Sequence, residues 1–157
     1  MILNLLNKKK EKNAENATNI NLIKIGALLI HAAKVDENYS EKEKKIIINF
    51  LIMCSKLKEI SGKNSGGIDE KQALYLLQKA EENENNSNQI LEYTKEVKKM
   101  DTNIKTLVLE TLWKIILSDD KSDVYESTLM RRICGLLYVS DKLSGEIKSN
   151  ILKGKKI

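Results

Sequence analysis

The sequence contains no proline, and only 4% of its residues are aromatic. Proline is the residue that most strongly interrupts a helix, so nothing of that kind divides the long segments of leucine, isoleucine, lysine and glutamate. In these segments the apolar residues recur at helical spacing. The chain of 157 residues has the size of one domain and is long enough to bury a core. We therefore predict an all-α, single-domain helical bundle of about seven helices.

Long apolar runs are also missing. No run approaches the roughly 20 residues that an α-helix needs to cross a bilayer. The opening apolar segment, Met1–Leu6, precedes its lysines, which is the reverse of the order in a secretory signal. We therefore expect a cytoplasmic protein.

Histidine and cysteine are scarce. The single histidine, His31, lies in an apolar run, where a packed or half-exposed side chain is more common than a ligand. Cys54 and Cys134 each lie in an apolar helical run, and we expect buried free thiols of a reducing compartment; a disulfide or a metal pair is the alternative. No nucleophile motif is present, so we predict that the protein is not an enzyme.

The positive charge is concentrated at the two ends of the chain. The net charge is +5, yet residues 1–12 and 148–157 together hold eight lysines and one glutamate, which leaves residues 13–147 slightly negative. A nucleic-acid-binding protein carries its basic face on the folded part, so we predict no nucleic-acid partner. We interpret residues 1–19 as an amphipathic basic segment with a linker, capable of a weak contact with a membrane surface, and residues 20–153 as the helical domain.

Two stretches of the chain repeat one another. Shifting the segment that begins at Leu29 by 83 positions places it on the segment that begins at Leu112, with Asp36 on Asp119 and no gap. Each copy consists of an apolar helix, a short acidic turn and an amphipathic helix. We predict that this doubled unit organises the fold.

Helix starts are marked by capping residues. Capping boxes are predicted at Ser40–Glu43, Asp69–Gln72 and Asp123–Glu126, and single caps at Asp101 and Ser140. A flexible loop is predicted at 61–67 and a polar hinge at 81–87. The predicted helices cover residues 20–34, 40–57, 69–82, 88–100 and 102–118, then a segment from 123 to about 137, and 140–152.

The repeated motif resembles the tellurite-resistance TerB-like family over about residues 20–150. The matching pattern is Ala32-Ala33-Lys34-x-Asp36 with a glutamate seven residues later, then Leu112–Asp119, and finally Met130–Asp141 with its arginine pair. The resemblance implies an all-α bundle of two similar halves, a metal site formed by the acidic turns, and a role in the response to tellurite and other chemical stress.

The family's acidic positions map onto four carboxylates of this chain. These positions are Asp36, Glu43, Asp119 and Glu126. Four converging carboxylates without a basic partner repel one another, and a hard divalent cation, Ca²⁺ or Mg²⁺, relieves that repulsion with oxygen ligands alone. The family usually has Asp-Gly at the turn, whereas here Glu37 and Asp120 follow the two aspartates.

A second interpretation needs no metal. Glu43 and Glu126 each occupy the third position of a capping box, which explains the glutamates fully. The aspartates lie before the caps and beyond helix C-termini, where negative charge is disfavoured, so the metal hypothesis rests chiefly on Asp36 and Asp119. The predicted function is a non-enzymatic, metal-binding TerB-like stress protein. The alternative is a helical module that binds an unidentified protein partner and whose acidic turns only cap helices. Such a module could also be peripheral to a membrane.

Overall fold

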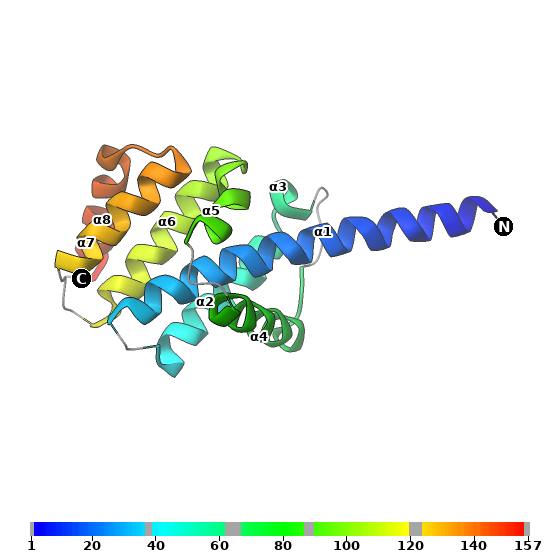
Figure 1. Ribbon diagram of the computed structural model, residues 1–157, viewed down its shortest axis with the longest axis horizontal. Helices are drawn as coiled ribbons and strands as arrows, with labels where there is room; N and C mark the ends of the chain where they lie inside the picture. Colours follow the sequence, from blue (N-terminus) through cyan, green and yellow to red (C-terminus); the bar gives the residue numbers. More distant parts are fainter. Residues whose placement is uncertain (1, 37–38, 62–66, 87–89, 120–123, 156–157) are drawn as a thin grey trace.

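In the part of the chain that the computed structural model describes, all regular secondary structure is helical. The described residues are 2–36, 39–61, 67–86, 90–119 and 124–155, with the backbone alone at 2, 7–17, 36, 119, 124–127 and 155. The predicted all-α class is confirmed. In chain order (Figure 1) the elements are α1 Ile2–Ala33, η1 Lys34–Asp36, α2 Glu41–Ser55, α3 Lys58–Ser61, α4 Glu70–Asn86, α5 Ile90–Lys98, α6 Thr102–Ile116, η2 Leu117–Asp119, α7 Val124–Leu137 and α8 Asp141–Lys155, where η marks a single 3₁₀ turn.

The predicted repeat is present in the backbone. Helix α1 ends at Ala33 and α6 ends at Ile116, 83 residues later. The 3₁₀ turns η1 and η2 follow at the same offset, and so do the starts of α2 at Glu41 and α7 at Val124. The two copies therefore fold into the same helix–3₁₀ turn–helix unit in the predicted register.

The core forms around the C-terminal half of α1 and around α6. Leu22, Ile25 and Leu29 on α1, and Val108 and Leu112 on α6, have no exposed surface. Helix α1 packs against α2, α4, α5 and α6, and α6 also packs against α8 and α2 (Figure 1). The two helices that open the repeated units are thus the central, buried ones, as their wide apolar faces predict.

Helices α1 and α4 approach each other closely at a glycine. A Cβ atom added to Gly26 would lie 3.0 Å from the Cβ atom of Ala80, closer than ordinary carbon contacts. Ala80 is fully buried. The small residues at this crossing let the two helix backbones pack tightly.

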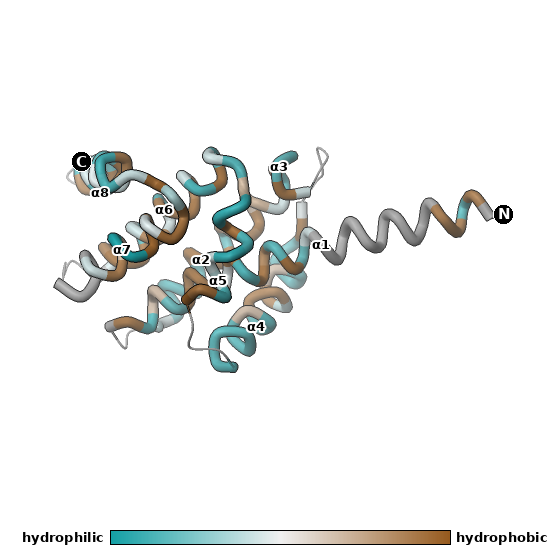
Figure 2. Tube along the Cα trace, turned by 45° about the horizontal axis from the view of Figure 1, so that its top comes forward, coloured by the Kyte–Doolittle hydropathy of each residue, from teal (hydrophilic) through white to brown (hydrophobic). Residues whose placement is uncertain are grey.

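The N-terminal part of α1 extends away from the body of the molecule (Figure 1). The expected linker within residues 13–19 is instead part of this continuous helix, because the chain has neither proline nor glycine before Gly26 to end it. Leu3, Leu5 and Leu6 at its tip are 51–76% exposed and form a hydrophobic end in Figure 2. Among the described helices, none is long and apolar enough to cross a membrane.

Capping residues fix several helix starts as predicted. Asp101 accepts a hydrogen bond from the backbone N–H of Asn103 at 3.1 Å. Asp69 and Gln72 exchange backbone-to-side-chain bonds of 2.8 and 3.1 Å. Ser140 Oγ accepts from the N–H of Leu143 at 3.2 Å. The Asp123 cap lies outside the described residues.

Two features of the middle of the chain differ from the prediction. Helix α4 continues to Asn86 through most of the segment predicted as a polar hinge, and the short helix α3 follows α2 without having been predicted. The extension of α4 brings the side chain of Glu84 into the body of the protein, where it is 6% exposed. Of the predicted loop at 61–67, residues 62–66 lie outside the described part.

Candidate functional site

The first repeated unit meets the acidic turn of the second unit at Glu43. This residue lies in the first turn of α2 and is only 2% exposed. Its Oε2 atom accepts a hydrogen bond from the backbone N–H of Ser40 at 3.1 Å and one from the Ser40 hydroxyl. Its Oε1 atom lies 3.1 Å from the hydroxyl of Ser118, in η2. The capping glutamate of the first copy is therefore bound to the turn of the second copy.

A lysine adds a second contact between the same two elements. Lys42 Nζ donates to the carbonyl oxygen of Ser118 at 3.0 Å. The Ser118 hydroxyl lies 2.7 Å from the carbonyl oxygen of Ile115 as well, so its single proton is shared between that oxygen and Glu43. The beginning of α2 is thus held against η2 through both the backbone and the side chain of Ser118.

The hydrogen bonds at Glu43 outweigh its burial. Burial by itself raises the pKa of the Glu43 carboxyl, since a charged group is costly to remove from water. The bonds from the Ser40 hydroxyl, from the backbone and from the Ser118 hydroxyl stabilise the carboxylate and bring the pKa below its ordinary value. Glu43 is therefore ionised at neutral pH, and both of its oxygens accept charge-assisted hydrogen bonds.

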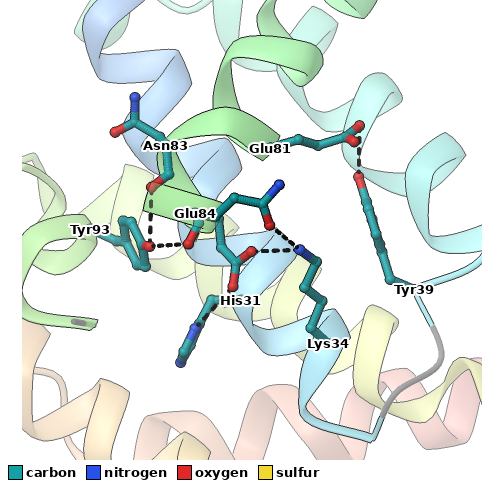
Figure 3. Close-up of polar contacts among 8 residues, drawn as sticks. His31, Lys34, Tyr39, Glu81, Asn83, Glu84 and Tyr93 are labelled. Carbon is teal, nitrogen blue, oxygen red and sulfur yellow. Dashed lines mark hydrogen bonds and ion pairs between the residues drawn. The ribbon is translucent and has the colours of Figure 1, made fainter. Parts of the chain in front are cut away.

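The first turn is also fixed to α4, on both sides of residues 36–38 (Figure 3). Before the turn, Lys34 Nζ lies 2.6 Å from Glu84 Oε2 and 3.0 Å from Asn85 Oδ1. After it, the Tyr39 hydroxyl donates to Glu81 Oε1 at 3.2 Å. Burial and the Glu81 carboxylate raise the pKa of Tyr39 well above its ordinary value, so the hydroxyl remains a donor.

Glu84 has two further neighbours from other helices, one at its carboxylate and one at its backbone carbonyl (Figure 3). His31 Nδ1 lies 3.6 Å from Glu84 Oε1, and the Tyr93 hydroxyl donates to the Glu84 carbonyl oxygen at 3.0 Å. The His31 side chain is 24% exposed, and its ring lies 5.8 Å from that of Tyr93. His31 is therefore a packed, partly exposed side chain, as predicted.

The structure locates the four predicted metal ligands unequally. Asp36 is the last residue of η1, Asp119 is the last residue of η2, and Glu126 lies in α7, but the side chains of these three lie outside the described part. Among the side chains that are described, no three of histidine, cysteine, aspartate or glutamate are grouped to hold a metal ion.

Glu43, the one predicted ligand with a described side chain, has the geometry of a cap. Both carboxylate oxygens already accept hydrogen bonds from the protein, and the Lys42 ammonium group is bound to Ser118, the same residue that Glu43 contacts. Oε2 accepts two of these bonds and Oε1 one, so most of the acceptor capacity of the carboxylate is already used within the protein. Glu43 therefore fits the capping role better than the role of a ligand.

Two contributors to this junction were not identified from the sequence. Ser118 is the counterpart of Val35 in the first copy, so the repeat gives no sign of its role. Lys42 lies on the polar side of its predicted helix, where a lysine is usually solvated. Both residues act across 75 or more positions of the chain, and such contacts leave no local pattern.

The two cysteines are buried and free, as predicted. Burial raises the pKa of the Cys54 thiol to about 12. Burial also raises the pKa of Cys134. Since the thiolate is the reactive form, neither residue is suited to act as a nucleophile at neutral pH.

A known protein family matches most of this chain. The family described as tellurite resistance protein TerB matches residues 22–149, which include both repeated units. Neither the search of curated proteins nor the search of solved structures gives a match. The match covers more than half of the chain and agrees with the helical fold, so the chain belongs to the TerB family of tellurite-resistance proteins.

Proposed function

We propose that this TerB-family chain is a non-enzymatic, cytoplasmic protein of the response to tellurite or related chemical stress, and that it binds a divalent cation between its two acidic turns. Ca²⁺ and Mg²⁺ are the ions that suit carboxylate oxygens best. Membership of the family supports the role in the stress response. The non-enzymatic character agrees with the two buried, protonated thiols.

One observation supports the location of the cation. Ser118 is bound to Lys42 and Glu43 at the beginning of α2, and Asp119 is the next residue after Ser118. On the other side, Lys34 and Tyr39 hold the chain that contains Asp36. The second acidic turn is therefore attached to the helix that the first one opens, which favours a shared site.

The aspartates are the proposed direct ligands. Each ends a 3₁₀ turn directly after a long helix, where the helix dipole disfavours negative charge. A cation would compensate for that unfavourable position. Glu126 is a further candidate, whereas Glu43 would keep α2 in contact with η2 without binding the ion.

Thermal unfolding tests this proposal. Protein first treated with a chelator should unfold at a higher temperature after Ca²⁺ or Mg²⁺ is added, by about 2.7 kcal/mol of stabilisation at a hundredfold excess over Kd. KCl at the same ionic strength controls for screening. Glu43→Gln should lower the unfolding temperature with and without the ion but keep the shift. A shift that is lost in Glu43→Gln would make Glu43 a ligand, contrary to the proposal.

A helical interaction module is the second candidate, and the extension of α1 favours it. Leu3, Leu5 and Leu6 are exposed at the end of a helix that leaves the body, next to the lysines of residues 8–12. An apolar tip followed by lysines suits a weak contact with an anionic membrane surface, or with a protein partner.

Cosedimentation with phosphatidylserine vesicles would test the membrane version. Leu3→Glu/Leu6→Glu should abolish sedimentation, whereas Leu74→Glu, at an exposed leucine on α4, should not. Absence of binding by the unmodified protein would exclude the membrane surface as the target of this helix.

A further inference from the structure

A hollow of about 400 Å³ lies between α5 and the C-terminal end of α7. Its wall is mainly apolar, with Leu91 on one side and Tyr138 on the other. Both side chains are more than half exposed. A Cβ atom added to Gly135, also in the wall, would meet nothing within 4 Å, so the hollow is open at this point. We call this feature the α5–α7 groove.

Three lysines surround the groove. Lys95, Lys98 and Lys99 all contribute to its lining. Several other lysines, such as Lys34 and Lys114, lie within 4 Å of a carboxylate. In the part of the chain that the structure describes, no such pair involves the three groove lysines. The groove is therefore apolar inside and positively charged at its edge.

Tyr138 is in an unfavourable backbone conformation. Its φ is +59°, in the left-handed region where glycine is the usual residue after a helix. The backbone N–H of Val139 donates to the Cys134 carbonyl at 2.9 Å and closes the end of α7. A glycine would make the same turn without strain, so the fold itself does not require the tyrosine. Tyr138 is 75% exposed, and Lys98 Nζ lies 4.7 Å from the centre of its ring.

We propose that the α5–α7 groove binds an acidic segment of a partner protein that carries an apolar or aromatic side chain among its carboxylates. The apolar side chain would enter between Leu91 and Tyr138, and the carboxylates would pair with Lys95, Lys98 and Lys99. Exposed aromatic side chains of this kind are frequent anchors of protein interfaces. The charge of the lysines would select acidic partners.

The surroundings of the groove favour a peptide over a long polyanion. Leu91 and Lys95 also line a second hollow of about 330 Å³, in which Glu92 and Glu96 balance Lys24 and Lys95. The positive edge of the groove therefore does not continue past Lys95, and a nucleic-acid strand or an anionic bilayer broad enough to reach all three lysines would meet these two carboxylates without a net positive charge to hold it. A short segment that enters the groove avoids them.

The groove is separate from the proposed cation site. It contacts the C-terminal end of α7, whereas the second acidic turn precedes the N-terminus of that helix. The 14 residues of α7 place these ends about 20 Å apart. Binding at the groove therefore does not depend on Asp36 or Asp119, and the two proposals can fail separately.

The test uses the full chain and a set of short fluorescein-labelled peptides, each with a central leucine, phenylalanine or tryptophan between aspartates and glutamates. Fluorescence anisotropy should show binding by at least one of them that weakens as salt is raised. Lys98→Glu/Lys99→Glu should weaken it at least tenfold, and Tyr138→Gly severalfold. Lys71→Glu, at an exposed lysine on α4, should have little effect, and neither should Asp36→Asn/Asp119→Asn.

Nuclear magnetic resonance locates the binding site of the peptide on the protein. In ¹⁵N-labelled protein, the bound peptide should shift the amide signals of residues 91–99 and 135–139. No binding by any peptide at millimolar concentration would overturn the proposal. So would equal binding of a peptide that has only acidic residues, or equal weakening by Lys71→Glu. Binding of a single-stranded oligonucleotide or phosphatidylserine vesicles at these amides in place of the peptides would make the groove a polyanion site and also refute it.

Discussion

The hydroxyl of Ser118 lies 3.1 Å from the Oε1 atom of Glu43, although 75 residues separate them in the chain. Glu43 closes the capping box that begins α2, and Ser118 belongs to the 3₁₀ turn after α6. The contact therefore joins the second helix of the first repeated unit to the turn of the second unit. The residue that caps α2 therefore also holds the two repeated units together.

This coupling predicts a non-additive response to mutation. Glu43→Gln should lower the free energy of unfolding by about 1–2 kcal/mol, because it removes a charged acceptor from a buried cap. Ser118→Ala should cost less, since it removes a neutral donor and leaves Glu43 with its two bonds from Ser40. Urea unfolding of the two single variants and the double variant should give a coupling energy of about 0.5–1.5 kcal/mol. Additive effects would show that the contact contributes nothing.

The lowered pKa of Glu43 predicts a pH dependence. Because this pKa is lower in the folded than in the unfolded protein, the carboxylate stabilises the fold at pH values above its unfolded pKa of about 4.3. The contribution is lost as the pH falls through the folded pKa. The stability difference between the unmodified protein and Glu43→Gln should therefore be larger near pH 7 than at about pH 3. Urea unfolding at the two pH values measures it, and a constant difference would contradict the assignment.

The close approach of α1 and α4 predicts opposite effects of one substitution at two glycines. Gly26→Leu should destabilise the protein by about 2–3 kcal/mol, because its Cβ alone would come within 3.0 Å of Ala80. Gly145→Leu is the matched control on α8, where an added Cβ meets nothing within 4 Å. It should stabilise by up to about 1 kcal/mol through helix propensity. Equal effects in thermal unfolding would show that the crossing is not tightly packed.

The left-handed conformation of Tyr138 predicts a gain in stability on mutation. Tyr138→Gly should raise the free energy of unfolding by about 1 kcal/mol, since glycine adopts this conformation without the steric penalty of a Cβ atom. The loss of the Lys98 contact subtracts about 0.5 kcal/mol from that gain. A decrease in stability would mean that the ring is needed by the fold, and would remove one argument for the groove.

The repeat, the helical class and most helix starts could be predicted from the sequence because they depend on local signals. Ser40 with Glu43, Asp69 with Gln72, and Asp101 all bind backbone groups within three residues of themselves. The register of the repeat appears in the order of apolar and acidic residues, and the element bounds follow it.

The remaining features depend on contacts between distant segments. Helix α4 continues past its predicted end because Lys34, 50 residues earlier, binds Glu84 and the Tyr93 hydroxyl binds its carbonyl. The polar composition of this segment alone predicts a hinge.

The different roles of the glutamates and the aspartates could be predicted from the sequence, since helix capping explains the glutamates but not the aspartates. Whether Asp36 and Asp119 act together remains a prediction.

Calorimetric titration with Ca²⁺ and Mg²⁺ tests the central claim most directly. The unmodified protein, freed of metal, should bind one of these ions, and Asp36→Asn/Asp119→Asn should abolish the binding. Asp101→Asn is the matched control, because asparagine caps α6 as well as aspartate does, and it should bind as the unmodified protein does. No heat of binding with either ion, or equal binding by Asp36→Asn/Asp119→Asn, would contradict a cation site between the acidic turns.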